Sequence, residues 1–261
     1  MQMAVEDHGA EIEAWADKRL QALCAADGWL NLTDRIEVPP GQHEVGTDPA
    51  CPMRISAGPA RLGTLDLAPD GTAALIREGT RLAFEPGPEV PPRLVIAGLL
   101  LELMTVETTR YLRVRDLLHP RRSNPPRLPR YPLSPAWRLQ GEWHVFDQPK
   151  QAAIQLVGGA GSEVTLTHEA RFWHDGRAVA LLATHWKAGL PMFVFRDATS
   201  GAETYGASRF LIGEPQGDQI LLDFNKAFSP PCAFSEHAVC PLPPRQNILP
   251  FAIRAGEMLP E

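Results

Sequence analysis

Two alternating runs of polar and apolar residues in the C-terminal half carry side chains suited to ligand binding or acid–base chemistry. The runs span residues 205–212 and 218–225, and their polar members are Tyr205, Arg209, Asp223 and Asn225. A turn that sets Ile212 opposite Asp218 places these four side chains on one face of an antiparallel hairpin. In that register Arg209 lies diagonal to Asp223, within reach of a long side chain. The pattern predicts a ligand-binding face with Asp223 as a candidate acid or base.

Two functional classes fit this face, and a third needs no site at all. The first is a non-catalytic domain that binds a small anionic or polar ligand on a concave sheet. The second is a hydrolytic or isomerising enzyme that uses Asp223 with Arg209 beside it. The third is a structural or protein-interaction domain in which an arginine–aspartate pair only orders the sheet. The sequence contains no recognisable nucleophile motif or cofactor fingerprint, which favours binding over catalysis.

The four cysteines are too few for a disulfide scaffold, and two of them raise the question of a metal. Cys232, His237 and Cys240 are side chains that zinc accepts, but C-x4-H-x2-C is not a standard spacing. We therefore expect no metal and interpret the two cysteines as buried thiols, either free or bridged. We also expect no flavin or nicotinamide, because no glycine-rich turn leads from a strand into a helix to hold a pyrophosphate.

Composition restricts the class of partner. The chain has 261 residues and a formal net charge of −6, which argues against general affinity for nucleic acid. A local concentration of positive charge comprises Arg110, Arg113, Arg115, Arg121, Arg122, Arg127 and Arg130. We interpret it as a linker whose arginines pair with nearby acids, with attraction of an anionic partner as the alternative. The longest apolar run is too short to cross a bilayer and the first residues are acidic, so we expect a cytoplasmic protein without a membrane partner. The pattern indicates no particular oligomeric state.

Periodicity predicts one helix followed by strands. Apolar residues recur at helical spacing over 11–26, and Asp27-Gly28 ends the pattern. The following segments are short apolar or alternating runs separated by glycine and proline turns, one of them a continuous run over 93–102. Asp175-Gly176 predicts a two-residue hairpin turn in which Phe172 faces Val179.

These elements predict a mainly β fold of two packed antiparallel halves, each like a sandwich or barrel, with one N-terminal helix. We expect an N-terminal domain over residues 1–118 that includes the helix. A connection rich in proline and arginine follows at 119–135, and an antiparallel meander occupies 136–261. Closely spaced prolines with interleaved apolar residues after Asn225 predict an ordered extended wrap at the C-terminal end.

Part of the N-terminal half resembles a forkhead-associated phosphopeptide-binding sandwich. The resemblance rests on a Trp-Leu strand at 29–30, PPG at 39–41, VGTD at 45–48 and REGTRL at 77–82. The residues that hold phosphate in that family are absent, because Thr47 follows Gly46 and Pro-Ala-Arg-Leu occupies 59–62. The resemblance therefore implies a degenerate scaffold without a phosphopeptide site.

A second resemblance covers most of the chain. Its segments are FRDATSGAETYGASRFL (195–211), LDFNKAFSPPCAF (222–234), CPLPP (240–244) and IRAGE (253–257), with LRVRD (112–116) and YPLSPAWRL (131–139) upstream. These segments resemble the bacterial and archaeal family catalogued as domain of unknown function number 1684. The resemblance implies no reaction, but it places the four polar candidates and both C-terminal cysteines within the family signature, and leaves His237 outside it.

Overall fold

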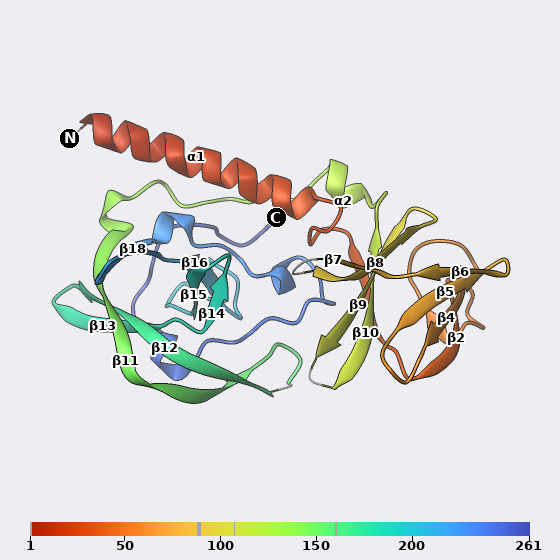
Figure 1. Cartoon of the computed structure of the whole chain (residues 1–261). Coiled ribbons are helices and arrows are strands. Elements are labelled where there is room, and N and C mark those ends of the chain that lie inside the picture. The colour runs from red at the N-terminus through yellow and green to blue at the C-terminus, as the bar shows by residue number, and fades with distance from the viewer. Residues whose placement is uncertain (1, 88–89, 107, 160) are drawn as a thin grey trace. The chain divides into compact units, whose positions relative to one another are not determined.

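The computed structural model describes residues 2–87, 90–106, 108–159 and 161–261 (Figure 1). The chain forms two compact units. Unit 1 comprises Met1–Leu20 with Pro126–Glu261, and unit 2 comprises Gln21–Pro125. The expected division had assigned the N-terminal helix to the first β half. The structure instead groups residues 1–20, which include most of the helix, with the C-terminal half. Polar side chains on the buried face of the helix bind residues of that half.

Helix α1 runs from Gln2 to Cys24, so it begins nine residues before the predicted start. Its buried face contains Ile12 and the half-buried Trp15, as the helical spacing predicted. The same face also carries His8, which is buried, and Arg19, which is half-buried. Both polar side chains bind acidic residues of unit 1, as described below.

Unit 2 is a pair of sheets with a shared apolar core, and its strand pairs are antiparallel apart from one short parallel pair at residues 45–46 and 53–54. Its strands are β1 (Leu32–Glu37), β2 (Gly41–Gly46), β3 (Met53–Arg54), β4 (Gly63–Leu67), β5 (Ala73–Arg77), β6 (Thr80–Ala83), β7 (Glu85–Gly87), β8 (Val90–Ile96), β9 (Leu99–Val106) and β10 (Thr109–Asp116). One sheet has the order β1-β10-β9-β8-β7 and the other β3-β2-β4-β5-β6. Side chains from both sheets, such as Leu65 and Leu101, are fully buried in one cluster, which makes a sandwich.

Unit 1 contains a sheet with two long strands that curve along their length (Figure 1). Its strands are β11 (Arg138–Gln155), β12 (Gly161–His174), β13 (Arg177–Leu182), β14 (His185–Lys187), β15 (Leu190–Phe195), β16 (Arg209–Ile212), β17 (Glu214–Gln216) and β18 (Gln219–Asp223). A five-stranded sheet has the order β13-β12-β11-β18-β17, and a three-stranded sheet has the order β14-β15-β16. Phe172 from the first sheet and Phe193 from the second lie in one buried cluster with Phe224. The fold class is therefore mainly β and sandwich-like, and no sheet of described strands closes into a barrel.

The predicted hairpin at Asp175-Gly176 is confirmed. Phe172 pairs with Val179 and His174 with Arg177, and both turn residues have positive φ. The run over 93–102 was predicted as one strand, which is wrong. Ala97-Gly98 forms a second turn of the same kind, with φ values of 50° and 77°, and divides the run into β8 and β9.

The arginine-rich stretch is mostly part of the fold. Arg110, Arg113 and Arg115 lie on β10, so this portion is not a linker. Arg115 is buried and its Nε donates to Glu102 Oε2 at 2.7 Å. Beyond β10 the chain forms one short helix, α2 (Pro120–Ser123), and then extends to the 3-10 turn η1 (Pro135–Trp137).

The C-terminal wrap, residues 226–257, is ordered by backbone contacts with the strands, as predicted. Arg196 exchanges backbone hydrogen bonds with Asn247 and Leu249, and Phe210 does the same with Phe228. Ile253 is fully buried. The wrap has no strand of its own. The 3-10 turn η2 (Phe224–Lys226) leads into it, and η3 (Pro231–Ala233) and η4 (Arg245–Asn247) lie within it.

Candidate functional site

The hairpin predicted to gather the four polar residues does not form. Strand β16 pairs with β15 in the three-stranded sheet, so that Arg209 lies opposite Phe195. Strand β18 pairs instead with β17, and Gln216 lies opposite Gln219 around a turn at Gly217-Asp218. The predicted register is therefore wrong.

Gly213 explains the difference, because the chain leaves one sheet and enters the other at this residue. A Cβ atom at Gly213 would lie 2.6 Å from the side chain of Ile220 and 2.8 Å from that of Phe193. These neighbours belong to the two different sheets, so a larger residue at 213 would force the side chain of Ile220 or Phe193 to shift.

Arg209 lies in a buried cluster that holds the C-terminal wrap. Its side chain is 0% exposed, and Nη2 donates to Asp197 Oδ2 at 3.2 Å. The guanidinium also donates to the backbone oxygens of Ile253 and Ala255 at 2.9 and 2.6 Å. The second interaction of Asp197 Oδ2 is with the backbone N–H of Ile253. Burial lowers the pKa of Arg209, and the charge of Asp197 opposes that effect.

Asp223 and Asn225 belong to a different buried cluster. Asp223 Oδ2 lies 2.6 Å from His8 Nε2, and its Oδ1 accepts from the side-chain amide of Asn225 at 2.9 Å. The amide of Asn225 also exchanges hydrogen bonds with the backbone of Ser134. The cluster therefore connects helix α1, β18 and the segment before β11. Asn225 also lines a 360 Å³ pocket beside helix α1 and residues 127–133.

Tyr205 is separate from both clusters. Its hydroxyl donates to the backbone oxygen of Cys232 at 3.0 Å. Burial, together with a hydrogen bond to Cys232, raises the pKa of Tyr205. The structure thus brings Asp223 and Asn225 together but places Arg209 and Tyr205 elsewhere. The proposed pairing of Asp223 with Arg209 as a catalytic or ligand-binding unit is wrong, since each is buried with another partner.

The three alternative metal ligands do not form a centre. Within residues 2–87, 90–106, 108–159 and 161–261, no group of three or more His, Cys, Asp or Glu side chains is arranged to hold a metal ion. His237 lies 3.8 Å from its neighbour Glu236. Cys232 and Cys240 do lie together, since the backbone N–H of Cys232 donates to Cys240 Sγ at 3.2 Å. Cys24, Cys51, Cys232 and Cys240 are thiols and are not joined in disulfides.

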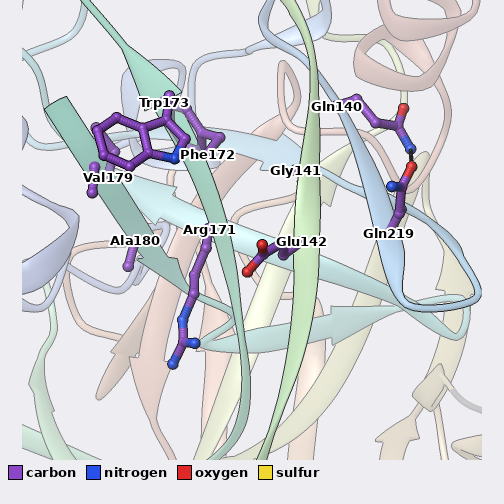
Figure 2. Close-up of a pocket in the computed structure, with 10 residues that line it drawn as sticks. Gln140, Gly141, Glu142, Arg171, Phe172, Trp173, Val179, Ala180 and Gln219 are labelled. Carbon is purple, nitrogen blue, oxygen red and sulfur yellow. Dashed lines mark hydrogen bonds between the residues drawn. The ribbon is translucent and has the colours of Figure 1, made fainter. Parts of the chain in front are cut away.

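A groove of about 660 Å³ lies on the outer face of the curved sheet of unit 1 (Figure 2). It crosses strands β13, β12, β11 and β18. One row of cross-strand neighbours comprises Gln219, Glu142, Arg171 and Ala180. A neighbouring row includes Gln140 on β11 and Trp173, which faces Ala178.

A close approach of two strands and short side chains on a third shape the floor of this groove. A Cβ atom at Gly141 would lie 2.7 Å from the backbone oxygen of Arg171, so β11 and β12 approach closely only because residue 141 is glycine. Ala178 and Ala180 are the short side chains on β13. Trp173 stands beside these short side chains. It is 72% exposed and forms an apolar wall of the groove.

Polar side chains form the rest of the groove. Gln140 Nε2 donates to Gln219 Oε1 at 3.0 Å, and Figure 2 shows Glu142 on the central strand pointing toward the strand that carries Arg171. Arg171 Nε donates to Glu169 Oε1 at 2.7 Å. Burial raises the pKa of Glu169, but hydrogen bonds from Gln246 and Arg171 outweigh burial and hold it below its usual value. The cation Arg171 thus lies near two carboxylates, those of Glu169 and Glu142. The groove therefore has no excess positive charge.

The groove was not predicted, although the sequence indicates which side chains of one of its strands face outward. The Asp175-Gly176 hairpin fixes which residues of β12 face outward, and these are Glu169, Arg171 and Trp173. The partner strand could not be aligned in advance, because β11 contains an irregularity between Val145 and Lys150 that shifts its register against β12.

Comparisons with known proteins place the chain in a family. A solution NMR structure of an uncharacterized protein from Haloarcula marismortui is 30% identical, and the match covers 52% of this chain and 78% of that one, with a TM-score of 0.43. No curated protein matches the chain. The family model described as "Protein of unknown function (DUF1684)" matches residues 126–258. The chain therefore belongs to the DUF1684 family, whose function is unknown.

Proposed function

We propose that the protein is a non-catalytic binding module that holds a saccharide in the groove of its curved sheet. The observation that carries this proposal is the position of Trp173. This side chain is 72% exposed and stands beside a 660 Å³ groove with polar walls. An indole exposed to this extent leaves apolar surface in contact with water. A ligand that stacks on the ring removes this surface from water, which is favourable.

The chemistry of the groove fits a neutral polyhydroxylated ligand. One face of a pyranose ring presents C–H groups that stack on an indole, and its edge presents hydroxyls that both donate and accept hydrogen bonds. Gln140 and Gln219 offer amides for such hydroxyls, and Glu142 offers an acceptor. Pockets of this kind combine an apolar wall with a few polar groups that fix the ligand's orientation.

The charge balance argues against a small anion as the ligand of this groove. Arg171 is already bound to Glu169 at 2.7 Å, and Glu142 adds a second negative charge nearby. An anion would have to displace Glu169 and approach Glu142. A neutral ligand does not have to displace Glu169 from Arg171, and it is not repelled by the charge of Glu142.

We further propose a cytoplasmic location and no nucleic-acid or membrane partner. The free cysteines support a reducing compartment, and the net charge of −6 disfavours polyanions. Among the described residues no helix is long and apolar enough to cross a bilayer.

The experiment is an NMR titration of the ¹⁵N-labelled protein with a panel of soluble hexasaccharides that differ in linkage. The indole N–H resonance of Trp173 is assigned with a Trp173→Phe variant. We expect at least one hexasaccharide to shift this resonance saturably, together with the side-chain amides of Gln140 and Gln219. Trp186 is the matched control, because it is 48% exposed on β14 and does not line the groove.

The proposal is contradicted if no saccharide shifts the Trp173 resonance. Equal shifts at Trp173 and Trp186 would also contradict it, because they would indicate general contact with exposed indoles.

A further inference from the structure

Two cysteines of the C-terminal wrap are held against each other. Cys232 lies in η3, and its backbone N–H donates to Cys240 Sγ at 3.2 Å. The backbone oxygen of Cys232 accepts from the hydroxyl of Tyr205 at 3.0 Å. The backbone oxygen of Cys240 accepts from Val157 N–H at 2.8 Å. Both residues are thus fixed from outside, and the thiol of Cys240 rests on the backbone of Cys232.

This arrangement suits a disulfide. A sulfur atom this close to the backbone nitrogen of Cys232 is within a side-chain rotation of the Cys232 sulfur, and an S–S bond needs about 2.05 Å. The eight-residue separation closes a short loop without moving a strand. Prolines at 230, 231 and 241 flank the pair on both sides and restrict the backbone from which the two cysteines project.

The two thiols differ in exposure. Cys232 is partly exposed, whereas Cys240 is 2% exposed. Hydrogen bonds with Cys240 and Tyr205 lower the pKa of the Cys232 thiol to about 7, against the effect of burial. Cys24 has similar exposure, but burial raises its pKa. At pH 7 an appreciable fraction of Cys232 is therefore thiolate, whereas Cys24 is held in the protonated form.

We propose that Cys232 and Cys240 form a redox-active dithiol in which a hydroperoxide oxidises Cys232 and Cys240 resolves the product to a disulfide. The Cys232 thiolate attacks the terminal oxygen of the hydroperoxide. The S–O bond forms, the O–O bond breaks, and the alkoxide that leaves takes a proton to become an alcohol. Cys232 is then a sulfenic acid.

The second step needs no further oxidant. Cys240 loses its proton and attacks the Cys232 sulfur, so the S–S bond forms and the S–O bond breaks. The departing hydroxide takes the proton as water. In total, two thiols and one hydroperoxide give one disulfide, one alcohol and one water. A thiol reductant restores the dithiol by exchange.

The test uses the reduced full-length protein and hydrogen peroxide as the probe, at pH 7, in one to five equivalents. Remaining thiols are alkylated, and the peptides are mapped by mass spectrometry. We expect a linked peptide that joins Cys232 to Cys240 and has lost two hydrogens, while Cys24 and Cys51 remain alkylated. Cys240→Ser should stop the reaction at a Cys232 sulfenic acid that dimedone traps, and Cys232→Ser should leave Cys240 unoxidised.

A second measurement needs no variant and therefore does not depend on how a substitution folds. The rate of iodoacetamide alkylation is followed at each cysteine of the wild-type protein from pH 5.5 to 9.5. We expect the rate at Cys232 to be half-maximal near pH 7 and the rate at Cys24 to be still rising above pH 9. Oxidation of Cys24 as fast as Cys232, or absence of the linked peptide, would overturn the proposal.

Discussion

At the scale of single residues, the polar side chains of the family segments build the interior of the protein. Arg209 is the clearest case, because its charge is completely buried and is balanced by Asp197 and two backbone oxygens. A buried pair of this kind contributes little net stability against an apolar replacement, but breaking it leaves an unpaired charge in the interior. Residue types alone suggested chemistry here, and only the fold shows that these groups are sealed.

Replacing Asp197 by Asn is therefore expected to destabilise the protein by about 3 kcal/mol or more. The amide cannot balance the charge of Arg209, and it leaves the N–H of Ile253 with a weaker acceptor. Urea unfolding monitored by circular dichroism measures the change. Glu261→Gln is the control, since its pair with Arg127 is exposed and should change stability by less than about 1 kcal/mol. A comparable loss in both variants would contradict this role for Asp197.

The sequence located Arg209 and Asp223 as important residues but could not identify their partners. The partner of Arg209 is twelve residues earlier in the chain, and that of Asp223 is 215 residues earlier, on helix α1. Apolar periodicity reveals which face of a helix is buried, yet it gives no sign that a polar residue on that face, such as His8, will meet a carboxylate.

At the scale of elements, the residue types at the turns determined which strand pairs could be predicted from the sequence. The hairpin at Asp175-Gly176 was predicted because this dipeptide favours positive φ at both positions. Glu78-Gly79, Ala97-Gly98 and Ala188-Gly189 form turns of the same kind with a less typical first residue. Their first residues carry no signal for positive φ, so the strand pairs around them could not be recognised from local sequence.

Helix α1 is attached to unit 1 by a polar contact that can be tested. Arg19 Nε donates to Glu257 Oε1 at 3.1 Å, and Nη2 donates to the backbone oxygen of Ser229 at 2.8 Å. The other oxygen of Glu257 accepts from Ser229 N–H. We expect Arg19→Ala to speed amide hydrogen exchange across residues 8–20 and around Ser229, because Glu257 loses its counter-charge. Lys18→Ala, on the exposed face, should leave exchange unchanged, and equal acceleration by both variants would refute the attachment.

Two histidines on β12 and β14 are expected to make unit 1 sensitive to acid. Burial lowers the pKa of both His168 and His185 below the usual value near 6.5. Below pH 6.5 the unfolded chain therefore binds protons that the folded protein does not. Their stabilising effect is complete above this pH and is lost as the pH falls toward the folded-state pKa.

The free energy of unfolding should accordingly decrease between pH 7.5 and 5.5. A variant with both His168→Gln and His185→Gln should show a smaller slope over the same interval, whatever its absolute stability. Urea unfolding at five pH values provides the slopes. The same slope in the two proteins would exclude these histidines as the cause.

At the scale of the whole molecule, unit 1 is built from two separate parts of the sequence. The family match covers residues 126–258, whereas the fold of that unit also includes residues 1–20. A division of the sequence into contiguous domains cannot reveal such an arrangement, which is why the helix was assigned to the first half. The mainly β class was predictable, because strand and turn patterns dominate the chain.

Within unit 1, the buried polar clusters and the two proposed functional sites are formed by different residues. Arg209 and Asp223 lie in the interior, where breaking their pairs is costly, while the groove and the cysteine pair lie on other parts of the same unit. We therefore predict that stability and ligand binding respond to different substitutions.

The most direct test of this claim is the affinity of Trp173→Ala for the hexasaccharide that shifts the Trp173 resonance, measured by isothermal titration calorimetry beside Trp186→Ala and the wild type. We predict that Trp173→Ala weakens binding by about tenfold or more, which corresponds to about 1.4 kcal/mol of stacking, and leaves the melting temperature unchanged. Trp186→Ala should bind as the wild type does. Wild-type affinity in Trp173→Ala would contradict the assignment of the groove as the binding site.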